Sequence, residues 1–237
     1  MAKKIIIDEK SNKYFWSQGD FHTPFGYIKE KDIKNGKVKT HKGNEMLVFE
    51  ASFSDNIERI KRGPAIILKK DAGTILANIC INDKSKVVEA GSGSGSFTSF
   101  LARISKNVTS YEVKKDYLEM AQKNCKALGL THVKFKNQDI KLGIDEDDLD
   151  VVILDLPEAE AVLPHAEKSL KSGGFLVAYL PNTTQVTTFV EASKQFNFVC
   201  EKVVESIERN WKFEGRIARP ENMGLMHTAF LVFLRRC

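Results

Sequence analysis

A glycine-rich turn between an apolar stretch and a helical pattern is the strongest chemical signal in the chain. Residues 87–97 have the sequence Val-Val-Glu-Ala-Gly-Ser-Gly-Ser-Gly-Ser-Phe. Glycines let a backbone approach a ligand closely, and the N–H groups at a helix start can bind it. A dinucleotide fingerprint needs its third glycine where Ser96 stands, and no Gly-Lys-Ser/Thr follows as in a P-loop. The turn therefore indicates a ligand-binding loop of another kind.

The pattern Glu-x-Gly-x-Gly-x-Gly, which begins at Glu89, is similar to the loop of class I S-adenosylmethionine (SAM)-dependent methyltransferases. A ribose in such a site needs a carboxylate acceptor at the end of the second strand, and Glu112 stands there, 17 residues after Gly95. Asp139 follows the third strand, where these enzymes place a side chain beside the adenine amine, and Asp155 follows the fourth. Open α/β sheets bind their ligands at these carboxyl ends of strands.

Each of these acidic residues also has a purely structural interpretation. A single Asp or Glu after a strand often caps a helix or lies in a solvated loop. Their common register with the glycine loop favours a ligand site instead. The acidic run at residues 145–148 is expected to be a solvated turn, and no metal site is predicted.

Strand and helix patterns alternate through most of the chain after Pro64. This alternation predicts an α/β fold with a doubly wound, mostly parallel sheet. The resemblance to class I methyltransferases implies that this sheet has seven strands. The segment 199–219 interrupts the alternation, and the last apolar run is expected to form an antiparallel pair at the edge. Strands are predicted at 87–89, 108–112, 133–135, 151–156, 175–180 and 229–234, and helices at 97–104, 115–128, 161–170 and 184–195.

Residues 1–62 have a different texture, with short apolar runs separated by turn signals such as Asn-Gly at 35–36. They predict a small N-terminal β domain with strands at 5–7, 14–16, 26–28 and 45–49, followed by the catalytic domain at 63–237. Residues 1–70 hold 15 Lys and Arg against 9 Asp and Glu, whereas the rest of the chain is nearly balanced. The basic excess fits a polyanionic partner, although solvated surface lysines explain it equally well.

The composition excludes several classes of protein. The chain has 237 residues, 42% of them hydrophobic, and few prolines, which disfavours disordered and collagen-like proteins. Its four cysteines form no CxxC pair, so a zinc ribbon is disfavoured and a reduced, cytoplasmic protein is expected. The first residues lack the apolar core of a secretory signal, and no apolar run approaches membrane-spanning length.

Four stretches, which together span nearly the whole chain, resemble the tRNA (adenine-N1)-methyltransferase family that modifies the T-loop. They are residues 19–28 (Gly-Asp-Phe-His-Thr-Pro-Phe-Gly-Tyr-Ile), residues 62–73 (Arg-Gly-Pro-Ala-Ile-Ile-Leu-Lys-Lys-Asp-Ala-Gly), the glycine loop with Tyr111-Glu112, and residues 208–232. The glycine loop alone indicates only a methyltransferase-like protein, whereas the four in this order are specific. The resemblance implies SAM as cofactor, tRNA as partner, methylation of N1 of adenine 58 and in archaeal-type members also 57, and a homotetramer.

The resemblance also implies roles for individual residues. Asp155 is implied as the catalytic residue and as a contact to the cofactor. The chain departs from the family at Ala159 and Glu160, where a proline and a tryptophan are usual, which leaves the shape of the target-base pocket open. The cofactor-binding residues that the resemblance implies are Ser94, Gly95, Ser96, Phe97, Glu112, Tyr117, Asp139 and Asp155.

Adenine N1 carries an in-plane lone pair and can attack a methyl group directly, so the reaction needs no protein nucleophile. The site must instead align the reacting atoms and stabilise the positive charge that develops on the base. The ionised carboxylate of Asp155 is suited to accept a hydrogen bond from the exocyclic N6 amine. This bond strengthens as the ring becomes cationic, which is differential binding of the transition state.

A tRNA substrate implies a large basic surface. Lys and Arg of residues 29–42 and 59–70, with Arg209, Arg216 and Arg219, are expected to contact phosphates. Aromatic residues in a β-rich sequence are more often core than base-stacking, but Trp16, Tyr27 and Trp211 are candidates for both. His22 and His227 are interpreted as structural, hydrogen-bonding histidines.

Two other functions remain open at this stage. One is a methyltransferase of the same fold that acts on a small molecule or on protein isoaspartate, which would leave the basic N-terminal domain without a purpose. The other is an RNA-binding, non-catalytic subunit of a heteromeric methyltransferase. Such subunits tend to lose the glycine loop and the catalytic acid, and this chain keeps both.

Overall fold

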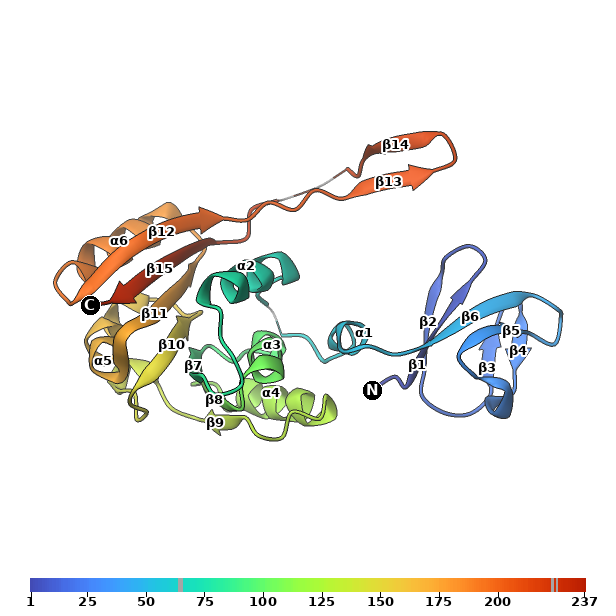
Figure 1. Cartoon of the computed structure of the whole chain (residues 1–237), viewed down its shortest axis with the longest axis horizontal. Coiled ribbons are helices and arrows are strands. Elements are labelled where there is room, and N and C mark those ends of the chain that lie inside the picture. Colours follow the sequence, from blue (N-terminus) through green and yellow to red (C-terminus); the bar gives the residue numbers. More distant parts are fainter. Residues whose placement is uncertain (64–65, 223, 225) are drawn as a thin grey trace. The chain divides into compact units, whose positions relative to one another are not determined.

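The computed structural model describes residues 1–63, 66–222, 224 and 226–237, which form two compact units, Met1–Ile60 and Lys61–Cys237 (Figure 1). The division predicted from the sequence lies two residues further along the chain. Across the described residues, no helix combines the length and the apolar character that crossing a membrane requires. The four cysteines are free thiols.

The first unit contains a four-stranded antiparallel sheet in the order β2-β1-β6-β5 and a separate strand pair, β3 with β4. Its core is a cluster of buried side chains that includes Ile6, Trp16 and Met46. The sequence predicted β1, β2, β4 and β6, but not β3 and β5. The elements are β1 (Lys4–Asp8), β2 (Lys13–Trp16), β3 (Phe21–Thr23), β4 (Gly26–Ile28), η1 (Glu30–Asp32), β5 (Gly36–Lys39), β6 (Glu45–Glu50) and α1 (Phe53–Ile57).

The second unit is built on a seven-stranded sheet in the order β12-β15-β11-β10-β7-β8-β9. The strands from β11 to β9 run parallel, and β15 pairs antiparallel with both β11 and β12. The expected antiparallel C-terminal edge is therefore confirmed. The elements are α2 (Lys69–Ile79), β7 (Lys86–Ala90), α3 (Ser96–Ile104), β8 (Asn107–Tyr111), α4 (Lys115–Ala127), β9 (Lys134–Lys136), η2 (Ile140–Leu142), β10 (Leu149–Leu154), η3 (Ala159–Val162), α5 (Leu163–Ser169), β11 (Leu170–Leu180), α6 (Thr183–Ser193), β12 (Phe198–Glu205), β13 (Trp211–Glu214), β14 (Ile217–Pro220) and β15 (Phe230–Arg236).

The two faces of this sheet pack against different helices. Val88 on β7 belongs to an apolar cluster that also contains Leu163 of α5 and Phe189 of α6. Glu89 points to the opposite face because successive side chains of a strand alternate. Thr98 of α3 donates a hydrogen bond to its carboxylate over 2.5 Å. Helices thus cover both faces, and the predicted doubly wound α/β class is confirmed.

The β13–β14 hairpin lies in the segment after β12, where the sequence predicted a break in the alternation of strands and helices. Its two strands pair with each other from Trp211–Pro220 to Glu214–Ile217, and in the described part of the chain they join no other sheet. Trp211 is 51% and Phe213 75% exposed, and their rings stack with centroids 6.3 Å apart. An isolated two-stranded hairpin is only marginally stable in water. Exposed apolar side chains that cluster on a surface often mark an interaction site, which applies to these two rings.

Candidate active site

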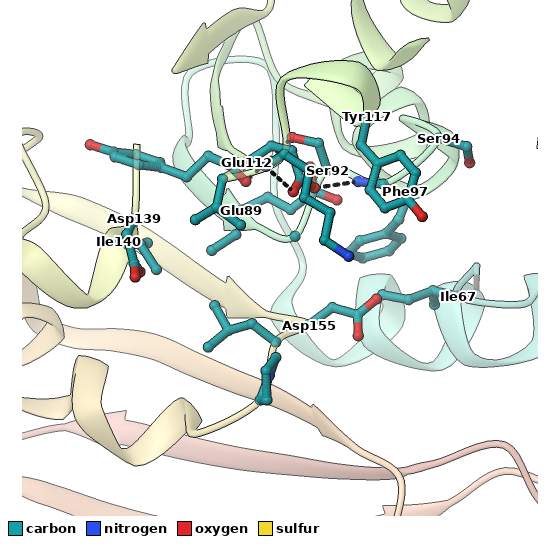
Figure 2. A pocket seen from close by; sticks show the side chains of 18 of the residues that line it. Ile67, Glu89, Ser92, Ser94, Phe97, Glu112, Tyr117, Asp139, Ile140 and Asp155 are labelled. Atoms are coloured by element: carbon teal, nitrogen blue, oxygen red, sulfur yellow. Dashed lines mark hydrogen bonds between the residues drawn. The ribbon is translucent and has the colours of Figure 1, made fainter. Parts of the chain in front are cut away.

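A pocket of about 340 Å³ lies at the carboxyl ends of β7, β8 and β10 in the second unit. Figure 2 shows Glu112, Tyr117 and Phe97 along one side of it, Asp155 on the opposite side, and Asp139 with Ile140 at one end. The sequence argument had placed a ligand at these strand ends. The pocket is also lined by the glycine loop, residues 91–94, and by residues 66–67 just before α2.

The glycine loop follows β7 with an unusually tight approach to the end of β10. Gly91 has a φ of +96°, and a Cβ atom there would overlap the carbonyl oxygen of Asp155. Gly95 has a φ of +74° and would place a Cβ atom 2.9 Å from Cα of Ala121 on α4. Only glycine satisfies both the backbone angle and the space at these two positions. The loop therefore forms a backbone-lined wall of the pocket.

Glu112 follows β8 and is held in place by two backbone donors. The N–H of Gly93 donates to one of its carboxylate oxygens and the N–H of Lys114 to the other, each over 3.0 Å. The side chain is largely buried, with 7% of the residue exposed. An ionised carboxylate has about four acceptor positions, so two remain for a ligand. Those two match the adjacent hydroxyls of a ribose.

Glu89, on β7, lines the pocket as a buried acid. Thr98 and Ser110 both donate to its Oε2, over 2.5 and 2.7 Å. Burial raises the pKa of Glu89 to about 7, and the nearby charges of Asp155 and Glu112 add to the rise, while the two hydrogen bonds oppose it. At neutral pH this group is therefore only partly ionised in the ligand-free chain.

Asp155 follows β10, and its backbone N–H donates to the carbonyl of Ala90 over 2.9 Å. Burial raises the pKa of the Asp155 carboxyl to about 6, and the charge of Glu112 adds to the rise. Three of the carboxyl groups that line the pocket, those of Glu89, Glu112 and Asp155, thus repel one another. A cationic ligand would relieve this repulsion, and a second anion would increase it.

This donor set fits SAM. Its positive charge would lie among Glu89, Glu112 and Asp155, and Glu112 has acceptors free for the ribose. The loop also contains a buried hydroxyl, Ser94 Oγ, that has no hydrogen-bond partner among the described residues. A buried polar atom without a partner costs free energy, which a bound ligand can recover.

The structure brings together seven of the eight predicted site residues. Ser94, Ser96, Phe97, Glu112, Tyr117, Asp139 and Asp155 line the pocket. Gly95 is the N-cap of α3 and is not among the residues that line the pocket. Because it has no side chain, α4 can pack close to it. Asp139 caps η2 by accepting a hydrogen bond from the N–H of Lys141 over 2.9 Å. Its bond to an adenine amine stays a prediction.

The sequence argument did not assign pocket positions to Ile66 and Ile67, although both fall in a stretch quoted for its resemblance. They add apolar surface to the pocket lining. Of the two departures from the family, Ala159 is buried in η3 and Glu160 is half-buried beside it. Pro64 and Ala65 lie outside the described residues.

A buried ion pair joins the start of α2 to the C-terminal strands. Lys70 Nζ donates to Asp71, to the hydroxyl of Thr228 and to the carbonyl of Ser206, over 2.6–2.8 Å. Thr228 in turn donates to Asp71 over 2.7 Å. The hydroxyl of Tyr179 on β11 also donates to this carboxylate, over 3.4 Å. Burial raises the pKa of the Tyr179 hydroxyl to about 12. The contacts hold residues from two of the resembling stretches in one network.

Of the two histidines interpreted as structural, one has the expected hydrogen bonds and the other does not. His227 is hydrogen-bonded as expected, with Nδ1 2.5 Å from Glu205 Oε1 and Nε2 2.8 Å from the carbonyl oxygen of Pro181. His22 is exposed, and among the residues that the structure describes its imidazole has no hydrogen-bond partner. Its ring instead lies against Tyr27. Trp16 is 9% exposed and belongs to the core, so it is not a base-stacking residue.

Comparison with known proteins agrees with this geometry. The family model described as "tRNA methyltransferase complex GCD14 subunit" matches residues 58–231. A protein of Methanocaldococcus jannaschii named tRNA (adenine(57)-N(1)/adenine(58)-N(1))-methyltransferase TrmI is 31% identical over 99% of this chain and 95% of its own length. A tRNA (adenine(58)-N(1))-methyltransferase TrmI of Thermus thermophilus is 36% identical over 98% of this chain and 96% of its own.

Two solved structures superpose on nearly the whole chain. One, titled a SAM-dependent O-methyltransferase from Thermotoga maritima, has a TM-score of 0.86 and 26% identity, and covers 99% of this chain and 92% of its own. The other, titled tRNA (m1A58) methyltransferase TrmI from Aquifex aeolicus, has a TM-score of 0.82 and 27% identity, and covers 99% and 96%.

The seven-stranded sheet, the glycine loop and the acidic pocket define a class I SAM-dependent methyltransferase. Within that class, the chain belongs to the tRNA (adenine-N1)-methyltransferase family, since the GCD14 model matches most of it and the TrmI proteins are similar over its full length.

The tight glycine loop leads to a first prediction. Gly91→Ala is expected to destabilise the fold by ~2 kcal/mol or more, because it adds backbone strain and a clash with Asp155. The expected loss in Tm is roughly 4–8 °C, with SAM affinity reduced as well. Gly129→Ala is the matched control, since Gly129 has a φ of +77° but open space around its Cβ position. Equal Tm values for the two variants would contradict the close approach.

Proposed function

We propose that the chain transfers a methyl group from SAM to N1 of adenine 58 in the T-loop of tRNA, and also to adenine 57 in suitable substrates. The observation that carries the proposal is the placement of Asp155 in a pocket whose other side holds the cofactor carboxylate Glu112. Membership of the family supports the tRNA substrate. The proposed place of action is the cytoplasm.

The residues act mainly by positioning and electrostatics. When bound, SAM supplies an electrophilic methyl group on a cationic sulfur, and the transfer moves this positive charge to the adenine ring. Glu112 holds the ribose end, and the backbone of the glycine loop sets the depth of the cofactor. Asp155 accepts a hydrogen bond from the adenine N6 amine. This bond fixes the in-plane lone pair of N1 in line and strengthens as the base becomes cationic.

Incubation with labelled SAM and an unmodified tRNA transcript tests the function directly. The expected product is 1-methyladenosine, detected by mass after digestion to nucleosides and mapped to position 58. A transcript with guanosine at position 58 is the matched control and should lose that product. A methylated small molecule or protein, with no methylated tRNA, would contradict the proposal and favour another acceptor.

Self-association is proposed from the exposed β13–β14 hairpin, in line with the homotetramer that the family resemblance implies. Exposed stacked rings of Trp211 and Phe213 on a marginal hairpin are explained if a second copy covers them. Arg216 and Arg219, on or beside the same hairpin, are exposed and are proposed phosphate contacts.

A double variant, Trp211→Ser with Phe213→Ser, is expected to lower the molar mass measured by light scattering toward that of one chain. The Tm of each dissociated chain should change little, because both side chains are exposed in the single chain. Leu142→Ser is the control, since Leu142 is 80% exposed elsewhere in the same unit. An unchanged assembly in the double variant would exclude the hairpin as the interface.

A further inference from the structure

Three ring side chains form a continuous stack on the surface of the first unit. The His22 and Tyr27 rings have centroids 5.7 Å apart at 34°, and the Tyr27 and His41 rings are 4.2 Å apart at 21°. His22 and His41 are exposed and Tyr27 is half-buried. The stack is separate from the core of the unit, which contains Trp16 and Phe21.

The backbone fixes the stack in place. His22 and Tyr27 are directly opposite each other in the β3–β4 pair, so their side chains share one face. The N–H of Tyr27 donates to Nδ1 of His41 over 3.0 Å, and the N–H of His41 donates to the carbonyl of Tyr27 over 2.9 Å. At Gly26, whose φ is +117°, a Cβ atom would lie 2.9 Å from His41 Nδ1. A glycine at this point therefore makes room for the third ring.

The turn that carries His41 is equally constrained. Thr40 and Asn44 both donate to the carbonyl oxygen of Phe25, over 2.9 and 2.7 Å. The stack is thus preorganised, and little side-chain entropy is lost when a planar ligand binds it.

The hydrogen bond to His41 also determines its chemistry. Because Nδ1 accepts the N–H of Tyr27, a neutral His41 must carry its proton on Nε2. His41 is exposed, and within the part of the chain that the structure describes this N–H has no acceptor, so it is available to a ligand. A flat ligand lying on these rings could therefore also receive a hydrogen bond at its edge.

The segment that leads to His41 is basic. Residues 29–42, which include η1 and β5, contain six lysines and two acidic residues, and Lys42 directly follows His41. A planar aromatic platform with nearby cations is the combination that binds single-stranded nucleic acid, since bases stack on the rings and lysines contact the phosphates.

We propose that the His22–Tyr27–His41 stack binds an unpaired base of the RNA substrate. The proposal rests on the tRNA function proposed above and adds the particular surface that recognises unpaired nucleotides. It also explains the environment of His22. A structural histidine would be hydrogen-bonded, whereas His22 is exposed and its ring contacts another ring. The chemistry recognised is a nucleobase face with an acceptor at its edge, without base-specific readout.

The test measures binding of the full chain to two fluorescent RNAs, a stem-loop with the T-arm sequence and a continuous duplex of the same stem. Tyr27→Ala and His41→Ala are expected to weaken binding to the stem-loop by roughly fivefold or more, the scale of losing one stacked base. Binding to the duplex should change by less than about twofold, since phosphate contacts remain.

Two further variants serve as controls. Tyr27→Phe keeps the ring and should bind as the original chain does. Phe49→Ala removes an aromatic side chain that is 45% exposed elsewhere in the same unit, and it should leave both affinities unchanged. The Tm of each variant shows whether the unit still folds. Retention of stem-loop affinity in Tyr27→Ala, or an equal loss on both RNAs, would overturn the platform.

Methylation assays keep this inference distinct from the proposed function. With tRNA as substrate, Tyr27→Ala should raise KM and leave kcat nearly unchanged, because the variant alters binding only. If the original chain prefers the stem-loop but forms no 1-methyladenosine, the proposed function fails while the platform stands. If it forms 1-methyladenosine and Tyr27→Ala has normal KM and affinity, the platform alone fails.

Discussion

Asp155→Ala is expected to lower kcat for tRNA methylation by at least ~100-fold, the scale of losing one transition-state contact. The carboxylate is the group placed to accept the adenine N6 amine, and this bond is worth most when the ring carries positive charge. SAM affinity, measured by calorimetry, should stay within roughly threefold of the original, because Glu112 and the glycine loop remain. A drop in kcat without loss of SAM affinity would show that Asp155 acts in catalysis and not in cofactor binding.

The raised pKa of Asp155 gives this prediction a pH profile. The ionised carboxylate is the stronger acceptor for the N6 amine and the form that stabilises the positive charge on the base, so activity falls as pH decreases through the pKa, which burial raises to about 6. The ratio kcat/KM should therefore rise between about pH 5 and pH 7 and then level off. Glu89, with its pKa raised to about 7, titrates in the same range, so a second variant is needed for the assignment.

Asp155→Asn makes that assignment. Asparagine keeps the shape of the side chain and an acceptor oxygen but has no charge to titrate. The Asp155→Asn variant should therefore have lower activity, and the pH dependence caused by Asp155 should be missing from its pH profile. At neutral pH the Tm of both variants should equal or exceed that of the original, because the ionised, buried carboxylate destabilises the fold above its pKa of about 6, and this difference should vanish at low pH, where the group is protonated. A wild-type kcat in Asp155→Ala would exclude Asp155 as the catalytic residue.

The sheet and its ligand edge were predictable because their signals are local. Buried parallel strands are short apolar runs, as at residues 87–90 and 151–154, and helical patterns of ordinary length separate them. The glycine loop and the acidic residues after it could be placed in register because carboxyl ends of parallel strands meet at one edge. Seven of eight predicted site residues line the pocket for this reason.

Several elements were missed because their sequences carry weak local signals. Helix α2 begins with two lysines and contains Gly73, so its pattern is poor, and contacts such as the ion pair from Lys70 to Asp71 help fix its first turn. Strands β3 and β5 are only three or four residues long. The β13–β14 hairpin is exposed on both faces and shows no alternation of burial.

Spatial contacts between distant residues were beyond the sequence argument. The stack of His22 and Tyr27 on His41 depends on a glycine that admits the third ring, and no spacing in the sequence indicates it. The mutual repulsion of Glu89, Glu112 and Asp155 is likewise a property of the folded pocket. The resemblance to a family identified the candidate site residues, but only the folded structure gives the distances between their side chains.

Glu112→Ala is expected to weaken SAM binding by roughly 100-fold, which corresponds to about 3 kcal/mol. Two charge-assisted hydrogen bonds from the ribose hydroxyls to a buried carboxylate account for a loss of this size. Calorimetric titration with SAM measures it. Asp116→Ala is the matched control, because Asp116 is an exposed acid on the first turn of α4, outside the pocket lining, and its variant should bind SAM normally.

Glu112 also anchors the N–H groups of Gly93 and Lys114, so a loss of affinity alone does not separate a ligand contact from support of the loop. An S-adenosylhomocysteine analogue without the ribose 2′-hydroxyl makes the distinction. It should bind the original chain more weakly than its parent compound, and bind Glu112→Ala about as well as the parent compound does. If removing the hydroxyl weakens binding equally in both proteins, the carboxylate supports the glycine loop without touching the ribose.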